Sequence, residues 1–238
     1  MDNALSHQVG IVVGASSGMG RATAIALAQH GMTVAAAARR MDRLTELSTQ
    51  RGIYPTACDV TDRNQVLQLV EFAYELRGRI DLLVYATGTN IPDRALSALS
   101  AQRWQDLIDT NLTGAFHCTQ AVVPHLRDNG GGLIVYLSSA AVQRADVSGV
   151  AYQASKHGLV GLAHGTRVEE RDHGIRTSVI FPGLCDTEIL TKRPTPTPQN
   201  VLAQALAPDD VAAAVLFLAQ LPPRALVPEL QLVPARLW

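Results

Sequence analysis

Residues 9–40 read VGIVVGASSGMGRATAIALAQHGMTVAAAARR. A short apolar run opens this stretch, a glycine-rich turn follows it, and a second apolar run covers residues 33–37. Between the two runs, residues 21–29 carry apolar side chains at helical spacing, and Gly31 stands where such a helix would end. The stretch therefore predicts a strand, a helix and a second strand, in that order.

The same alternation continues along the chain. Further apolar runs cover residues 81–85, 133–137 and 177–181, and a weaker run covers residues 53–57. Asp62 and Gln65 have the spacing of a capping box for a helix that extends to Leu76. Strands that alternate with helices pair in parallel, because each crossover needs a dozen or more residues. The fold class predicted is a doubly wound α/β fold in a single domain.

Composition limits the function classes. The 238 residues are 47% apolar and 17% charged, which indicates a globular chain with a sizeable core. The net charge of -1 gives no electrostatic case for nucleic acid or an anionic membrane as partner. Three widely spaced cysteines predict a reduced, cytoplasmic protein, and neither an export leader nor a membrane span is expected. No metal site is expected, because the seven histidines lack metal-ligand spacing.

The glycine-rich turn resembles a phosphate-binding loop. Glycines let backbone N–H groups approach a pyrophosphate, and the positive end of the following helix favours the same anion. The alternative is a glycine-rich turn without a ligand. The candidate cofactor-binding residues in this loop are Gly14, Ser16, Ser17, Gly18, Met19 and Gly20.

Arg39 and Arg40 follow the second strand, where NAD-binding folds usually carry a carboxylate for the ribose hydroxyl. The guanidinium fork suits a 2'-phosphate, so NADP(H) is predicted over NAD(H). An alternative is that both arginines are simply solvated, and it applies to Arg40 more readily than to Arg39. Arg39→Asp is accordingly expected to shift the preference towards NAD(H).

Tyr152 and Lys156 stand four residues apart, so a helix would project both from one face. A nearby ammonium stabilises a phenolate, and we expect Lys156 to lower the pKa of Tyr152 towards neutrality. Such a pair could then transfer a proton. Ser138 and Ser139 close a preceding strand and offer hydroxyl groups near the same strand ends.

From Gly14 to about Leu221, the chain resembles the short-chain dehydrogenase/reductase family. The resemblance rests on the glycine-rich loop, the serines at a strand end and the Tyr-x3-Lys pair. It implies a Rossmann fold with a parallel seven-stranded sheet, helices on both faces, and a homo-oligomer, either a dimer or a tetramer. In this family the serine lies thirteen residues before the tyrosine, a spacing that selects Ser139 over Ser138.

The resemblance also implies roles for individual residues. Tyr152 would donate or accept the proton, Ser139 would orient the substrate oxygen, and Lys156 would bind the nicotinamide ribose. Asn111, in the sequence Thr-Asn-Leu-Thr-Gly, would position a water molecule that relays protons. The further cofactor contacts implied are Asp59, Val60, Gly88, Pro182, Gly183 and Thr187.

Several positions depart from the family pattern. The usual Asn-Asn-Ala-Gly after the fourth strand is Tyr85-Ala86-Thr87-Gly88 here, which keeps the glycine but loses both amides and puts the local support of the strand in doubt. Val13 replaces a frequent threonine, and Phe181 replaces a usual asparagine. Residues 230–238 lack the common Asp-Gly-Gly ending, so contacts that form a tetramer there are less certain.

The leading hypothesis is an NADP(H)-dependent oxidoreductase that interconverts a carbonyl and a secondary alcohol. One alternative is a regulatory protein that binds the nucleotide without catalysis. Another is a dehydratase or epimerase that uses a bound nucleotide internally. The sequence leaves the substrate open among hydroxy acids, ketones, sugars and acyl thioesters.

The expected substrate region includes a surface segment near residues 187–207, in which three prolines alternate with threonines. Prolines at this spacing exclude a regular helix or a central strand, so the segment is either a lid or a plain connector. Candidate wall residues are Val142, Gln143, Leu184 and Ile189. Cys185 is interpreted as a small buried side chain rather than a nucleophile.

Overall fold

The computed structural model describes residues 5–237, and its centre is a seven-stranded parallel sheet with the order β3-β2-β1-β4-β5-β6-β7. The strands are β1 (Val9–Val13), β2 (Thr33–Ala38), β3 (Ile53–Ala57), β4 (Leu82–Tyr85), β5 (Gly132–Leu137), β6 (Ile175–Pro182) and β7 (Glu229–Leu232). The doubly wound α/β prediction and its Rossmann topology are confirmed. The strand order reverses between β1 and β4, which places a crevice at their carboxyl ends.

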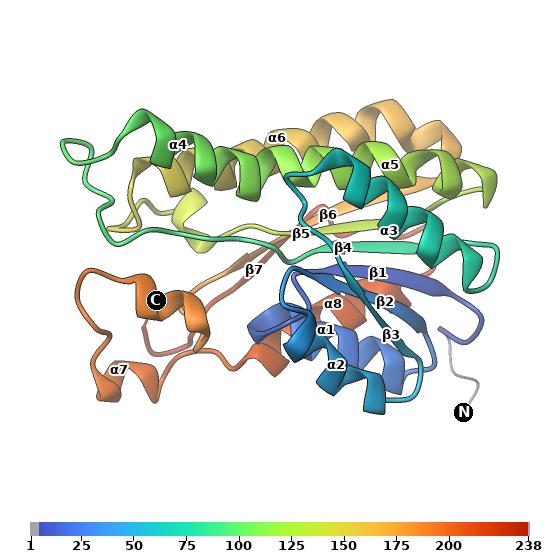
Figure 1. The fold of residues 1–238 in the computed structure, drawn as a ribbon, viewed down its shortest axis with the longest axis horizontal. Helices are drawn as coiled ribbons and strands as arrows, with labels where there is room; N and C mark the ends of the chain where they lie inside the picture. The colour runs from blue at the N-terminus through green and yellow to red at the C-terminus, as the bar shows by residue number, and fades with distance from the viewer. Residues whose placement is uncertain (1–4, 238) are drawn as a thin grey trace.

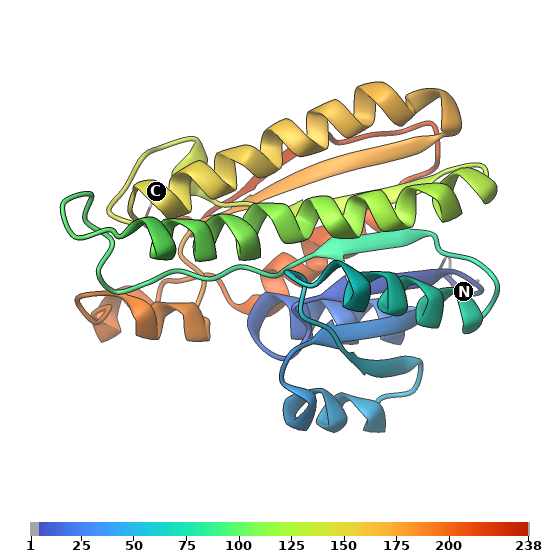
Figure 2. The same cartoon turned by 45° about the horizontal axis from the view of Figure 1, so that its top comes forward.

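Helices cover both faces of the sheet, as Figures 1 and 2 show. One face carries α3 (Arg63–Glu75), α5 (Gly114–Asp128) and α6 (Val150–Glu170), with α4 (Ala101–Ile108) leading into α5. The other face carries α1 (Gly18–Gln29), α2 (Met41–Thr45) and α8 (Pro208–Gln220). Both faces are therefore buried, which explains why the central strands are continuously apolar.

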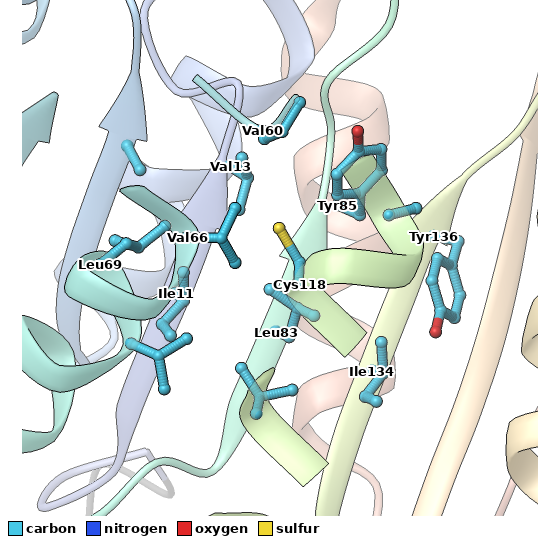
Figure 3. Packing of buried hydrophobic residues seen from close by; sticks show 14 of the residues in the cluster. Ile11, Val13, Val60, Val66, Leu69, Leu83, Tyr85, Cys118, Ile134 and Tyr136 are labelled. Carbon is cyan, nitrogen blue, oxygen red and sulfur yellow. The ribbon is translucent and has the colours of Figure 1, made fainter. Parts of the chain in front are cut away.

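Two apolar cores lie between the layers, one on each face of the sheet. Figure 3 shows the first core, where Leu69 of α3 and Cys118 of α5 pack against Ile11 and Leu83 of the sheet. On the opposite face, side chains of α1 and α8 pack against β1, β4 and β5. The two cores hold the central strands in fixed positions, and the loops at the strand ends are built on this frame.

The edge strands differ from the central ones. β3 lies at one edge of the sheet and contains Pro55, which has no N–H to donate. An edge strand tolerates this loss because it pairs with a neighbour on one side only. Two of its five residues are exposed, and this explains the weakness of the corresponding apolar run in the sequence.

The expected helix boundaries are close to those observed. The first helix begins at Gly18 rather than at residue 21, and Gly31 ends it with a φ of 92°. Asp62 caps α3 by accepting a hydrogen bond from the Asn64 N–H at 2.9 Å. The expected capping box is incomplete, because Gln65 Oε1 accepts from the N–H of Asp59 at 2.9 Å instead of from that of Asp62.

The segment 187–207 consists mainly of loop. It contains a 3-10 turn over Glu188–Lys192 and a single helical turn, α7 (Gln199–Leu202), which begins just inside the proline-rich stretch. In Figure 1 this segment, drawn in orange, extends beyond the sheet at the left of the molecule. Within residues 5–237, none of the helices combines the length and apolar character needed to cross a membrane.

Candidate active site

A cleft of about 770 Å³ opens at the carboxyl ends of the parallel strands. This is the size of a typical site for a cofactor or small molecule. The predicted cofactor residues that line it are Gly14, Ser16, Ser17, Gly18, Met19, Gly20, Arg39, Arg40, Asp59, Val60, Gly88, Pro182, Gly183 and Thr187. Ser139, Tyr152 and Lys156 line the same cleft.

Of the four predicted substrate-wall residues, Leu184 and Ile189 line the cleft. Val142 packs against the apolar core, and Gln143 is exposed, so neither belongs to the lining. Arg144, Ala145, Asp146 and Ser148, from the segment before α6, line this part of the wall instead.

The glycine-rich loop makes a tight turn between β1 and α1. Gly14 has a φ of 88°, and a Cβ there would lie 2.8 Å from the Thr87 backbone nitrogen. The N–H groups of Gly14 and Ala15 both bond to the Ala37 carbonyl oxygen, at 2.8 and 3.1 Å. These two N–H groups are used within the turn, and the feature that fits a pyrophosphate is the positive N-terminus of α1, which begins at Gly18.

Arg40 is docked on this loop. Its Nη2 donates to Ser17 Oγ at 2.8 Å, and its Nε donates to Ser16 Oγ at 3.3 Å. Its Nη1 bonds to Glu188, which also pairs with Arg43. These two hydrogen-bonded guanidinium groups lower the pKa of Glu188. Arg40 is therefore ordered at the cleft, contrary to the interpretation of it as the more readily solvated of the two arginines.

Arg39 is less constrained. Its side chain is 68% exposed, and its Nη1 lies 3.9 Å from Asp59 Oδ2. Asp59 also accepts from the hydroxyl group of Thr61 at 2.8 Å, which holds its carboxylate at the end of β3. Both arginines thus flank the place where the adenosine ribose would lie, and Arg40 has the more defined position.

Ser138 and Ser139 have different surroundings. Ser138 is buried and its Oγ donates to the Lys156 carbonyl oxygen at 2.9 Å, so this hydroxyl ties β5 to α6. Ser139 Oγ accepts a hydrogen bond from the Ala141 N–H at 3.2 Å and also bonds to the Tyr152 hydroxyl. The geometry therefore agrees with the choice of Ser139 as the serine beside the tyrosine.

Tyr152 and Lys156 share one face of α6, as their spacing predicts. Lys156 Nζ lies 5.9 Å from the centroid of the Tyr152 ring. The ammonium is buried and donates to the Leu137 carbonyl oxygen at 2.8 Å. A Cβ on Gly88 would lie 3.0 Å from this nitrogen, so the glycine leaves room for the lysine.

The pKa of Tyr152 departs from expectation. Burial raises it, and the charge of Asp146 raises it further. The hydrogen bond with Ser139 and the charges of Arg94 and Arg193 oppose that rise. Lys156 is not among the groups that lower the pKa of Tyr152, so the expectation that its ammonium lowers this pKa is wrong. The physical reason is that burial penalises both charged forms, since it also lowers the pKa of Lys156 to about 8.

Asn111 lies behind the cleft rather than in its lining. It occupies a π-helical turn (Asp109–Thr113) and is fully buried. Its Oδ1 accepts from the Thr89 N–H at 2.8 Å, and its Nδ2 donates to Ser155 Oγ at 2.9 Å. Asn111 therefore connects the loop after β4 with α6, and its role with water stays a prediction.

Tyr85 takes a structural role that the sequence did not reveal. It stands at the first position of the family's Asn-Asn-Ala-Gly and is fully buried, and its hydroxyl donates to the Thr110 carbonyl oxygen at 2.5 Å. A π-helical turn leaves the regular ladder of backbone hydrogen bonds incomplete. Tyr85 supplies a bond within the turn that holds Asn111, so a phenol provides support in place of an amide.

We expect Tyr85→Phe to lower the free energy of unfolding by about 1–2 kcal/mol, because the substitution leaves a buried carbonyl without this donor. Urea denaturation measures the loss, and hydrogen exchange of residues 109–113 shows whether the turn loosens. The exposed Tyr54 of β3 provides a control, Tyr54→Phe, which removes a hydroxyl without a buried partner. Unchanged exchange in the turn would contradict this role of Tyr85.

The depressed pKa of Lys156 predicts a pH effect on stability. The folded lysine loses its proton near pH 8, whereas the unfolded one keeps it to about pH 10.5. Below pH 8 the buried charge costs about 3 kcal/mol, and this cost disappears as the pH rises to about 10.5. Lys156→Met should therefore be more stable relative to wild type at pH 7 than at pH 10.

Urea denaturation of both proteins at pH 7 and pH 10 tests this expectation. Titration of the buried cysteines and tyrosines affects both proteins equally, so the difference between them isolates Lys156. A stability difference that does not change with pH would show that the lysine titrates normally in the folded protein.

The cysteines and histidines add no further chemistry to this cleft. Cys185 is buried, and burial raises its pKa to about 12, which agrees with its interpretation as a packed thiol. Among the residues that the structure describes, no three His, Cys, Asp or Glu side chains gather as metal ligands would.

The cleft also contains charged residues that sequence reasoning missed, namely Arg94, Arg144, Asp146, Glu188, Lys192 and Arg193. They belong to three loops that are distant in the sequence, and no motif marks them. Lys192 ends the 3-10 turn of the segment 187–207 and Arg193 follows it, so a basic pair in that segment was the only available signal.

The parallel sheet, its crevice at the reversal of strand order and the glycine-rich loop together define a Rossmann-type protein of the dinucleotide-binding class. Residues 8–197 match the family model described as short chain dehydrogenase. The chain belongs to the short-chain dehydrogenase family.

Individual relatives agree with this assignment. The chain is 32% identical to a 3-oxoacyl-[acyl-carrier-protein] reductase of Thermotoga maritima, over 90% of this chain and 91% of that protein. An alcohol dehydrogenase from Thermococcus sibiricus, solved with 5-hydroxy-NADP, superposes with a TM-score of 0.85 at 29% identity and covers 96% of this chain and 97% of its own. A 3-ketoacyl-(acyl-carrier-protein) reductase from Brucella melitensis superposes with a TM-score of 0.89 over 98% and 99% of the two chains, and its 22% identity shows likeness of fold.

Proposed function

We propose that this protein is an NADP(H)-dependent oxidoreductase that interconverts a carbonyl compound and a secondary alcohol. The observation that supports it best is the convergence of Tyr152, Ser139 and Lys156 on a cleft that the glycine-rich loop also lines. A nucleotide sensor would need the loop but not this set of side chains. Family membership favours the same class of reaction.

The cleft fits a nicotinamide dinucleotide. The glycines of the loop leave bare backbone at the N-terminus of α1, and the positive end of that helix favours a pyrophosphate. Pro182, Gly183 and Thr187 line the same cleft and would hold the carboxamide. The nicotinamide supplies or accepts the hydride when it is bound. The residues of this chain bind the cofactor, orient the substrate and transfer the proton.

The chain's own residues divide the remaining work. Tyr152 Oη gives a proton to the carbonyl oxygen in reduction and takes it back from the alcohol in oxidation. Ser139 Oγ hydrogen-bonds to the same substrate oxygen and keeps it beside the tyrosine. Lys156 Nζ, held at the Leu137 carbonyl oxygen, would bind the nicotinamide ribose.

NADP(H) is favoured by the two arginines at the end of β2. Arg40 is held at the loop serines and Arg39 lies beside it, so both can reach a 2'-phosphate. The relative from Thermococcus sibiricus is bound to an NADP derivative, which supports the same preference.

The segment 187–207 is proposed to cover the cleft as a lid. Glu188 of this segment pairs with Arg40, and Lys192 Nζ donates to Thr89 Oγ1 at 2.6 Å across the cleft. These contacts connect it to α2 on one side and to the loop after β4 on the other. The dimeric or tetrameric assembly and the cytoplasmic location stay predictions.

A panel of ketones, aldehydes and oxoacids tests the proposed function, with loss of NADPH absorbance as readout and NADH assayed in parallel. We expect at least one compound to be reduced, with NADPH preferred. Nucleotide binding without turnover of any compound would favour the regulatory alternative. Nucleotide that stays bound through purification, without net consumption, would favour a dehydratase or epimerase.

A further inference from the structure

The part of the cleft beside Tyr152 is rich in cations. Arg94 comes from the loop after β4, and Arg193 comes from the segment after β6. Both charges act on Tyr152, since both oppose the rise of its pKa. Lys192 differs from them, because its pKa is lowered by the charges of Arg39 and Arg40 after the larger effect of burial. Arg94 and Arg193 therefore lie close enough to act on Tyr152, whereas Lys192 Nζ bonds to Thr89 Oγ1 at 2.6 Å.

Arg94 is held firmly in this position. Its Nε donates to the Ile91 carbonyl oxygen at 3.1 Å, and its Nη2 donates to the Lys192 carbonyl oxygen at 2.6 Å. Its backbone packs against Gly149, where a Cβ would lie 2.9 Å from the Arg94 carbonyl oxygen. Gly149 immediately precedes α6, the helix that carries Tyr152, so Arg94 is fixed relative to the proton donor.

The hydrogen-bond partners of both arginines are neutral. Arg94 bonds to carbonyl oxygens, and Arg193 Nη1 donates to Thr197 Oγ1 at 3.0 Å. Within residues 5–237, no carboxylate lies within 4.0 Å of either guanidinium as an ion-pair partner. These bonds orient the guanidinium groups without neutralising them.

The charges around this pair leave it positive. Arg144 also lines this part of the cleft. Asp146 is the acidic side chain that raises the pKa of Arg94, and one of its oxygens accepts from the Ser148 N–H at 2.8 Å. Burial lowers the pKa of Arg94, and the charge of Arg193 lowers it further. Two cations that repel each other at a partly buried site are stabilised when an anion binds between them.

We propose that Arg94 and Arg193 bind a carboxylate of the substrate, so that the substrate class is an oxoacid and the corresponding hydroxy acid. A guanidinium fork matches the two oxygens of a carboxylate. Leu184, Ile189 and Leu190 line the same cleft and provide apolar contact for the carbon chain between carboxylate and carbonyl. This inference rests on the proposed oxidoreductase function and narrows its substrate.

Paired substrates test the inference. Acetoacetate and levulinate are compared with their methyl esters, which carry the same ketone without the negative charge. We expect wild type to favour the acids in kcat/KM, and Arg94→Gln or Arg193→Gln to lower the acid-to-ester ratio about tenfold or more, mainly through KM for the acids. The ratio cancels any change that affects both substrates equally.

Arg171→Gln is the matched control. Arg171 is exposed at the far end of α6 and lies outside the cleft lining, so its substitution changes the net charge equally and should keep the ratio. An equal fall of the ratio in this control would show that the effect arises from overall charge, and would overturn the proposed contact.

A binding measurement separates this inference from the proposed function. Levulinate should raise the Tm of wild type, and this rise should be lost in Arg94→Gln. The rise without turnover of any ketone would support the carboxylate site and contradict the oxidoreductase. Turnover of acids and esters at equal kcat/KM, with the same levulinate-induced rise of Tm in wild type and Arg94→Gln, would overturn the carboxylate site. The proposed oxidoreductase function would then remain.

Discussion

Tyr152→Phe is expected to lower kcat/KM about 10²- to 10⁴-fold, which is the usual contribution of a positioned general acid or base. The phenyl ring keeps the packing of Tyr152 on α6 and removes the hydroxyl group that bonds to Ser139. Cofactor affinity should stay within about twofold of wild type, because the glycine-rich loop and the arginines at β2 are unchanged. Initial rates with a ketone that the wild type reduces measure kcat/KM, and titration with NADPH measures cofactor affinity.

The control for this variant is Tyr54→Phe. Tyr54 is 44% exposed on β3 and lies outside the cleft, so its hydroxyl has no part in the proposed reaction. Activity in Tyr152→Phe that stays above a tenth of wild type would contradict the assignment of Tyr152 as the proton donor. Loss of both activity and NADPH binding would indicate a damaged cleft, and circular dichroism would reveal whether the fold is intact.

Arg40→Ala is expected to lower kcat/KM with NADPH about 10- to 100-fold while the value with NADH changes little. A hydrogen bond to a charged group contributes about 1.5–3 kcal/mol, and the 2'-phosphate that would accept it is absent from NADH. The docking of Arg40 on Ser16 and Ser17 makes it the better ordered of the two candidates. Arg39→Asp should shift the preference in the same direction, by charge repulsion.

Measuring NADPH and NADH kinetics for both variants identifies the arginine that contacts the phosphate. Arg103→Ala serves as the control, since Arg103 pairs with Asp93 on the surface and lies outside the cleft lining. An NADPH/NADH ratio that is unchanged in both variants would mean that the phosphate binds elsewhere. A change in Arg39→Asp alone would return the role to Arg39, as the sequence favoured.

The fold was largely predictable because its signals are local. The runs that became β1, β2, β4, β5 and β6 are continuously apolar, since both faces of the sheet are covered. β7 was harder to detect: it is an edge strand of four residues, none of them fully buried. An edge strand needs fewer apolar residues, and its pairing with β6 depends on contacts distant in the sequence.

The proposed catalytic pair was predictable for a similar reason. Tyr152 and Lys156 are separated by about one helical turn, so their common face follows from helix geometry alone. Helix geometry could not decide between Ser138 and Ser139, because neighbouring residues of an extended segment point in different directions. The family spacing selected Ser139, and the structure shows that Ser138 is committed to the Lys156 carbonyl oxygen.

The sequence was less informative about electrostatics. The spacing of Tyr152 and Lys156 says nothing about how deeply they lie, and burial reverses the expected direction of the phenol's pKa change. The same holds for Arg94 and Arg193, which are 99 positions apart and reach one cleft only because the ends of parallel strands meet at one edge of the sheet.

The positions of the strands and helices along the chain and the glycine-rich loop therefore follow from local patterns of side-chain size and polarity, because periodicity and backbone freedom are properties of short segments. The choice between Arg39 and Arg40, the support of Asn111 by Tyr85 and the cationic end of the cleft depended on folding. Each of these arises where loops from different strands come into contact, and the free energy of a charge there depends on burial and neighbours that no short segment contains.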